Sequence, residues 1–137
     1  MRHPKVKRAL LLVALLATVS IETGAATASQ NKAQRVRFEK GKSSATIRGR
    51  VAGFDTQDYL VAARAGQQMD IRITTTNGST YFVLYSINDR PTDMNETDHY
   101  SLETTESGDY VIRVFMMRSA ARRKNAVSNY TLTISIK

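Results

Sequence analysis

The sequence has no cysteine, no tryptophan and only two histidines among its 137 residues. Without cysteine, no disulfide can stabilise the fold and no thiol can act as a nucleophile. His3 lies in the N-terminal leader, so His99 is the only histidine left for a catalytic site, and its polar surroundings are those of an ordinary surface residue. The acidic residues fall mostly on turns or outward strand positions, unlike the paired carboxylates of a glycosidase. We therefore expect no catalytic residues and no enzyme activity.

Long apolar runs are also missing, except at the N-terminus. Residues 1–8 carry four basic side chains, and Ala9–Val19 is apolar except for Thr18. Ala26–Ala28 then forms a small-residue cleavage motif, which completes the pattern of a secretory signal peptide over residues 1–28. The apolar run is shorter than the roughly 20 residues that span a bilayer, and no cysteine follows it to carry a lipid. We expect export and no membrane anchor.

The mature chain, residues 29–137, suits one compact domain. The leader removes four basic residues and one acidic residue, so 16 basic and 11 acidic residues remain, a net charge of +5. This charge is too small and too scattered to indicate nucleic-acid binding, but it fits an acidic partner surface. A chain of this size can bury enough apolar surface to fold without disulfides.

Acidic residues crowd together only in the segment 89–98. Oxygen ligands of the kind that calcium takes come from four residues there, Asp89, Asp93, Glu96 and Asp98. Their spacing lacks the alternating pattern and the glycine of a calcium-binding loop, and Arg90 lies among them. A solvated connector is the better interpretation, and we expect neither a metal nor another cofactor.

Apolar and polar residues alternate with a period of two through most of the mature chain. The apolar positions are Val36 and Phe38; Ala45, Ile47 and Val51; Tyr59, Val61 and Ala63; Met69, Ile71 and Ile73; Tyr110, Ile112, Val114 and Met116; and Tyr130, Leu132, Ile134 and Ile136. Gly49 also falls on an inward position. These segments are rich in β-branched and aromatic residues, and turn-forming residues separate them. The pattern predicts an all-β fold, a small antiparallel β-sandwich of about seven or eight strands.

Two segments differ from this pattern. Tyr81–Tyr85 is almost continuously apolar, which predicts a buried central strand. Ser119–Lys124 is the only segment in which we expect a helical turn.

The most specific binding features flank one of the alternating segments. A Ser-Gly-Asp-Tyr turn precedes it at Ser107–Tyr110, and Gly108 supplies the backbone freedom that a tight turn needs. Taken alone, this turn is more typical of architecture than of function. Arg118 and Arg122 follow the segment and are four residues apart, so one helical turn would place both guanidinium groups on one face, where they suit carboxylates. If the intervening residues form a strand, the two loops lie at its opposite ends. If the chain bends or the neighbouring strands are short, both loops can still meet one flat partner surface.

These motifs resemble those of the periplasmic inhibitors of g-type lysozyme from Gram-negative bacteria. The similarity runs in order through residues 35–137. The matching motifs are Val36–Gly41, Ser43–Ala45, Gly53–Asp55, Asp58–Tyr59, Ala65–Gln67, Ser107–Tyr110, Arg113–Val114, Arg118, Ala121–Arg122 and Ile134–Lys137. The loop at Arg122–Asn125 is slightly longer than the family pattern.

The resemblance implies a periplasmic protein that protects peptidoglycan by inhibiting g-type lysozyme. It implies that the Ser-Gly-x-Tyr loop and an adjacent arginine-bearing loop enter the acidic cleft of that enzyme. Carried over to this sequence, hydroxyl groups of the turn meet polar groups of the cleft, and the arginines pair with its carboxylates. The implied lysozyme-binding residues are Ser107, Gly108, Tyr110, Arg118 and Arg122. The implied partner is g-type lysozyme, and the sequence leaves the oligomeric state open.

Two alternatives are a purely structural envelope protein, which would not bind lysozyme, and a secreted β-sandwich accessory module that binds glycan or another envelope protein. Glycan binding by stacking needs an aromatic platform. The chain has no tryptophan, and its tyrosines fall mostly on inward strand positions.

Overall fold

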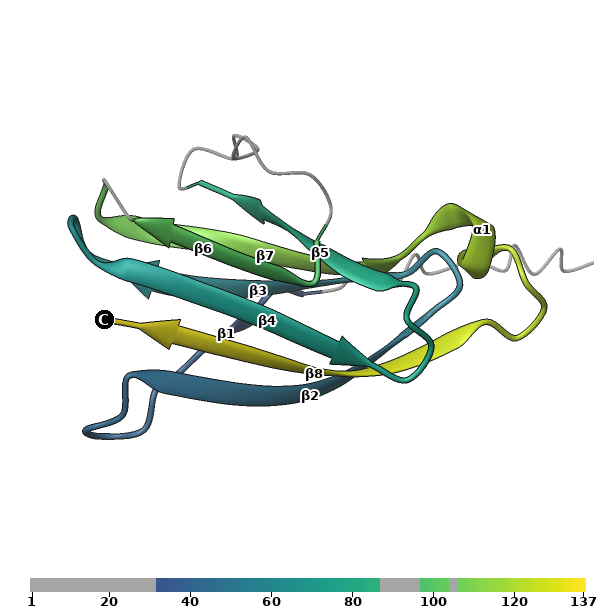
Figure 1. The fold of residues 1–137 in the computed structure, drawn as a ribbon, viewed down its shortest axis with the longest axis horizontal. Helices are drawn as coiled ribbons and strands as arrows, with labels where there is room; N and C mark the ends of the chain where they lie inside the picture. The colour runs from purple at the N-terminus through teal and green to yellow at the C-terminus, as the bar shows by residue number, and fades with distance from the viewer. Residues whose placement is uncertain (1–31, 87–96, 104–105) are drawn as a thin grey trace, which may run out of the picture.

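Eight β-strands and one short helix make up the described part of the chain (Figure 1). The computed structural model describes residues 32–86, 97–103 and 106–137. The predicted signal peptide and most of the acidic segment 89–98 lie outside these residues. The elements are β1 (Gln34–Arg35), β2 (Ser44–Ala52), β3 (Thr56–Ala63), β4 (Gln68–Thr75), β5 (Thr80–Tyr85), β6 (His99–Glu103), β7 (Gly108–Met116), α1 (Arg118–Ala121) and β8 (Val127–Ile136).

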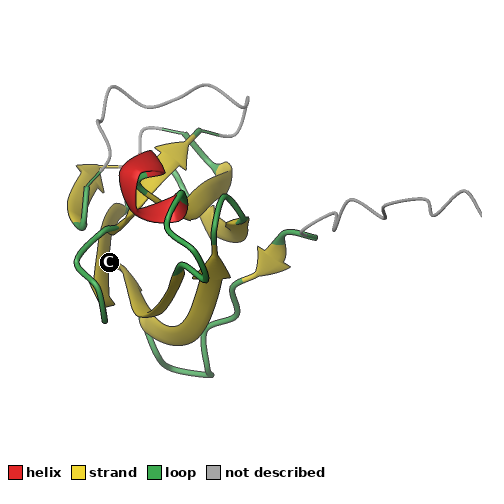
Figure 2. Cartoon of the chain, turned by 90° about the vertical axis from the view of Figure 1, so that its right-hand side faces the viewer, coloured by secondary structure: helices red, strands yellow, loops and turns green. Residues whose placement is uncertain are grey.

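The strands form two four-stranded sheets that pack face to face, which confirms the predicted β-sandwich. One sheet has the order β1-β3-β7-β5 and the other has the order β2-β8-β4-β6. All neighbouring strands are antiparallel except β1, which pairs with β3 in parallel. Seen from the α1 end, the two layers enclose the core and α1 lies at the end of the sandwich (Figure 2).

The core consists of the inner faces of the two sheets. Alternate residues of the long strands are buried, as the period of two predicts. Almost fully buried side chains include Tyr59, Val61, Met69, Ile71, Phe82, Leu84, Ile112, Val114, Leu132 and Ile134. The alternating segments at Tyr110–Met116 and Tyr130–Ile136 therefore point their apolar side chains inward as expected.

Three expectations change in the structure. β5 is an edge strand rather than a central one, and it continues the apolar pattern on its outer face, where Tyr81, Val83 and Tyr85 are half-buried. The expected strand at Val36–Phe38 is replaced by β1, which is only two residues long and ends before Val36. The expected helical turn begins one residue earlier, at Arg118.

Within the described ranges, no helix is long and apolar enough to cross a membrane.

A glycine on an edge strand makes room for a tyrosine that connects the two sheets. Gly49 of β2 pairs with Tyr130 of β8, and a Cβ atom at Gly49 would lie only 2.3 Å from the Tyr130 hydroxyl oxygen. The Tyr130 ring thus occupies the space that a side chain at position 49 would fill. Its hydroxyl lies 2.7 Å from the hydroxyl of Tyr59 on β3, in the other sheet. Each tyrosine hydroxyl thus has a hydrogen-bond partner inside the core.

Replacing Gly49 with alanine is expected to lower the free energy of unfolding by roughly 1–3 kcal/mol, because the new methyl group overlaps the Tyr130 ring. Urea denaturation followed by circular dichroism measures this loss. The same substitution should cost less in a Tyr130→Leu background, where the ring is absent. Equal losses in the two backgrounds would contradict this explanation.

Stability should also fall at alkaline pH because of the tyrosine pair. Burial disfavours the phenolate form and raises the pKa of both Tyr59 and Tyr130 above the ordinary value near 10. As pH rises, the unfolded chain therefore loses these protons first. The contribution of the two tyrosines to the free energy of unfolding is fully present below about pH 10. Above that pH it declines, by up to ~1.4 kcal/mol per pH unit for each tyrosine.

Urea denaturation at several pH values between neutral and strongly alkaline tests this expectation. A Tyr59→Phe/Tyr130→Phe variant, which cannot ionise at either position, should show a shallower decline. If the free energy of unfolding of this variant falls as steeply with pH as that of the parent, the alkaline loss of stability comes from other groups.

Candidate functional site

The Ser-Gly-Asp-Tyr turn is engaged in contacts within the protein. The Ser107 hydroxyl accepts a hydrogen bond from the backbone N–H of Ala65 at 2.8 Å, which connects this turn to the turn between β3 and β4. Asp109 receives two hydrogen bonds from the guanidinium group of Arg35, at 2.8 and 2.5 Å. The Arg35 guanidinium holds the pKa of the Asp109 carboxyl below its ordinary value. The turn thus fixes two neighbouring segments.

Tyr110 is a core residue with a polar end. Its ring is buried, and its hydroxyl donates to the backbone carbonyl of Glu106 at 3.2 Å. Gly108 has a φ of 154°, in a region that glycine enters more readily than other residues. Of the three predicted binding residues in this turn, only Ser107 is exposed.

Arg118 and Arg122 are presented by α1 and the residue that follows it. The helix is attached to the core through Ala120 and Ala121, which are buried. The Arg122 N–H donates to the Arg118 carbonyl at 3.1 Å, so the two arginines are one helical turn apart, as predicted. Both side chains are exposed, and neither has a hydrogen bond or ion pair within the described residues. Two guanidinium groups are thus available to an acidic partner.

The two halves of the predicted site lie at opposite ends of β7. Ser107 precedes this nine-residue strand and Arg118 follows it, so they are separated by about 30 Å at ~3.4 Å per residue. Figure 1 shows α1 at one end of the sandwich and the entry to β7 at the other. The two loops are therefore not neighbours in the fold, and their joint insertion into one cleft stays a prediction.

A different loop is the neighbour of α1. The backbone N–H of Gly53 donates to the carbonyl of Ala126 at 2.9 Å, and a Cβ atom at Gly53 would lie 3.9 Å from the carbonyl oxygen of Ala121. This contact places the turn between β2 and β3 beside α1. The next residue in that turn, Phe54, is 65% exposed.

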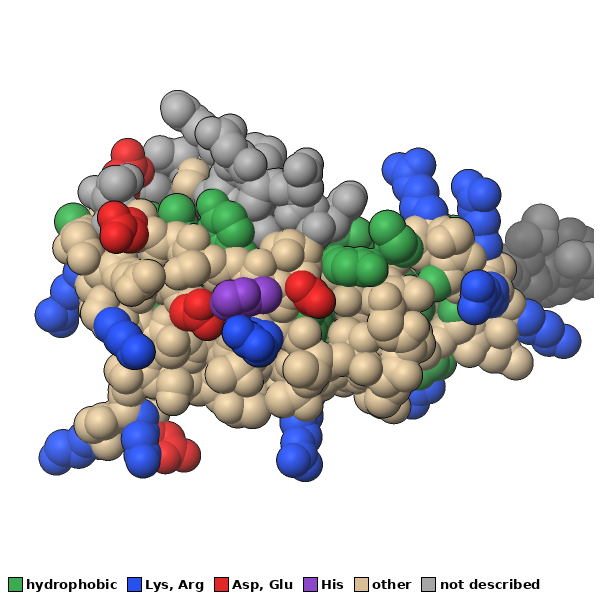
Figure 3. Space-filling view, in the orientation of Figure 1, with side chains coloured by type: hydrophobic (Ala, Val, Ile, Leu, Met, Phe, Trp, Pro, Cys, Tyr) green, Lys and Arg blue, Asp and Glu red, His purple; other side chains and the backbone are tan. Residues whose placement is uncertain are grey.

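Phe54 and Met117 are the two large hydrophobic side chains that are exposed in the described part of the chain. Met117, which is 44% exposed, directly precedes α1. We call the surface formed by Phe54, Met117, Arg118 and Arg122 the α1 surface. Lysine and arginine side chains gather at this end of the molecule (Figure 3), since Arg123 and Lys124 are exposed next to it. Sequence reasoning did not assign Phe54 or Met117, although an aromatic residue within a Gly-Phe-Asp turn is an indication of exposure.

His99 is paired with one carboxylate on an outer sheet face. Its Nε2 atom lies 2.9 Å from Oδ2 of Asp70, and both side chains are close to half exposed. This is the surface position that the sequence predicts. Asp98, the described end of the acidic segment, is also exposed, and within the described residues no group of three or more His, Asp or Glu side chains could hold a metal ion.

Removing the Ser107 hydroxyl should lower stability slightly. A Ser107→Ala variant leaves the Ala65 N–H without its side-chain partner, and we expect a loss of about 1 kcal/mol in the free energy of unfolding by urea denaturation. Ser119→Ala is a matched control, because Ser119 is exposed and its hydroxyl has no described partner. Unchanged stability in Ser107→Ala would contradict the structural role of this hydroxyl.

Comparisons with known proteins give a consistent result. The chain is 32% identical, over 143 aligned positions that cover all of both proteins, to the inhibitor of g-type lysozyme of Escherichia coli K12. Its fold is similar to that of Aeromonas hydrophila PliG, a periplasmic inhibitor of g-type lysozyme, with a TM-score of 0.68, 29% identity, and 77% of this chain and 96% of that chain covered. Salmonella Typhimurium PliG gives a TM-score of 0.59 at 29% identity, with 77% and 98% covered. No protein-family model matches the sequence.

Proposed function

The chain belongs to the family of g-type lysozyme inhibitors, and we propose that it acts in the periplasm by closing the cleft of such a lysozyme with its α1 surface. The observation that carries this proposal is that α1 and its flanking residues carry exposed Met117 and two guanidinium groups with no partner among the described residues, and that the turn with exposed Phe54 packs beside them. Interface hot spots commonly combine an aromatic anchor with arginine in this way. An inhibitor of this kind protects peptidoglycan without performing any chemistry itself.

The two kinds of side chain have different roles in the proposed complex. Arg118 and Arg122 pair with carboxylates of the lysozyme cleft, where two planar guanidinium groups can each make two parallel hydrogen bonds. Phe54 and Met117 bury apolar surface beside these pairs and exclude water, which strengthens the electrostatic attraction. The buried Ala120 and Ala121 keep α1 on the core, so little ordering is required on binding.

The sequence also predicts that Ser107, Gly108 and Tyr110 bind the lysozyme. This remains a proposal with a geometric condition, because both ends of β7 can touch one lysozyme only if the enzyme extends along the whole strand. The internal hydrogen bonds of Ser107 and Tyr110 favour a supporting role for this turn instead. Variants at the two ends separate these two roles.

Replacing Arg118 or Arg122 with alanine should weaken inhibition at least about 30-fold, because truncating one partner of a desolvated charge pair typically costs ~2–5 kcal/mol. The measurement is lysis of peptidoglycan by a g-type lysozyme in the presence of increasing amounts of the purified residues 29–137. Stability should not change, since neither side chain has a described partner. Arg37→Ala, at another exposed arginine, should leave inhibition unchanged.

Three results can overturn parts of this proposal. No inhibition of any g-type lysozyme at micromolar concentration would reject the function. Full inhibition by the Arg118→Ala/Arg122→Ala variant would keep the function and reject the α1 surface. Loss of inhibition in Ser107→Ala, without loss of stability, would place the contact at the other end of β7.

A further inference from the structure

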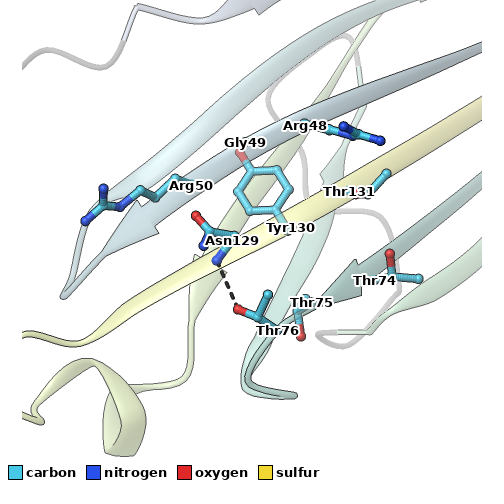
Figure 4. A pocket seen from close by; sticks show the side chains of 9 residues that line it. All are labelled: Arg48, Gly49, Arg50, Thr74, Thr75, Thr76, Asn129, Tyr130 and Thr131. Atoms are coloured by element: carbon cyan, nitrogen blue, oxygen red, sulfur yellow. Dashed lines mark hydrogen bonds between the residues drawn. The ribbon is translucent and has the colours of Figure 1, made fainter.

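A shallow hollow lies on the outer face of the sheet β2-β8-β4-β6, and none of its lining residues belongs to the α1 surface. Its volume is about 620 Å³, within the range of about 300–1,000 Å³ that is usual for ligand sites. Arg48 and Arg50 of β2 border one side, and Thr74 and Thr76 border the other (Figure 4). Between them β8 contributes the smaller side chains of Asn129 and Thr131, which leaves the middle of the sheet recessed.

The positive charge of this hollow is not neutralised. The side chains of Arg48 and Arg50 are exposed and have no hydrogen bond or ion pair within the described residues. Among the residues that the structure describes, no acidic side chain lines the hollow. Figure 4 shows the two arginines extending away from one another along β2, so a single small anion cannot engage both. A ligand with two separated negative charges fits this arrangement better.

Hydroxyl and amide groups occupy the space between the charges. Cross-strand pairing places Arg48, Thr131 and Thr74 in one row across the three strands. In the next row, the Thr76 hydroxyl accepts a hydrogen bond from the Asn129 N–H at 3.3 Å, and the Thr76 N–H donates to the Asn129 carbonyl at 3.0 Å. These two hydrogen bonds hold Thr76, which borders the hollow, against β8. The hollow therefore presents fixed polar groups that suit the hydroxyl groups of a sugar.

The hollow has no aromatic surface on which a neutral sugar could stack. Tyr130 contributes to the lining, but its side chain is buried and its hydroxyl is directed to Tyr59 in the core. Binding must therefore depend on charge together with hydrogen bonds. We propose that this hollow binds an acidic oligosaccharide, a sugar chain in which carboxylate or phosphate groups are separated by neutral positions.

The proposal is tested by titrating the ¹⁵N-labelled mature protein with a hyaluronan tetrasaccharide, whose carboxylates alternate with neutral sugars, and following backbone amide shifts by NMR. Amides of Thr74, Asn129 and Thr131 should shift, and raising the salt concentration should weaken binding, since the charges are exposed. Chitotetraose, which is neutral, and inorganic phosphate, which has no sugar, should each bind at least about tenfold more weakly. A phosphorylated oligosaccharide compared with the hyaluronan fragment distinguishes phosphate from carboxylate ligands.

Variants locate the site and separate it from lysozyme inhibition. Arg48→Gln and Arg50→Gln should each weaken binding roughly tenfold, whereas Arg37→Gln should not. Both hollow variants should inhibit lysozyme as the parent does, and the Arg118→Ala/Arg122→Ala variant should still bind the saccharide. Equal binding of chitotetraose or of phosphate, or amide shifts confined to the α1 surface, would overturn the proposal, whatever the outcome of the lysozyme assay.

Discussion

The burial of one apolar face of each sheet against the other is the interaction on which the whole structure depends. The chain has no cysteine, so no covalent link joins the sheets. The alternating inner residues supply the contact, and the hydroxyl pair of Tyr59 and Tyr130 crosses from β3 to β8. A phenol that enters a dry core without a partner is costly, so each tyrosine requires the other. Gly49 follows from the same requirement, because only glycine leaves space for the Tyr130 ring.

The strands were largely predictable because their pattern is local. A residue such as Ile112 is buried because its neighbours alternate with it, and this can be seen within nine residues of sequence. The position of β5 in its sheet was not predictable in this way. The order of strands in a sheet depends on which distant segments pair. A continuous apolar run also occurs in an edge strand when the outer face of that strand is half-buried, as it is at Tyr81 and Tyr85.

The candidate site was predictable only in part, for a related reason. The spacing of Arg118 and Arg122 fixed their common face, since one helical turn is a local structure. The assumption that the Ser107 turn is adjacent came from the family resemblance, although the strand between the two loops already implied their separation. Phe54 reaches α1 through the contact of Gly53 with Ala126, which are 73 positions apart in sequence and could not be connected by any local pattern.

The end of the chain lies far from the α1 surface. The backbone of Lys137 exchanges two hydrogen bonds with Gln68 at the start of β4, so the last residue is held at a fixed place on the sandwich. The ten residues of β8 separate this place from α1, and Figure 1 shows the two at opposite ends. A peptide tag or a surface linker joined to Lys137 would therefore lie at the end of the sandwich opposite Phe54 and the two arginines, and would leave these side chains open to a partner in solution.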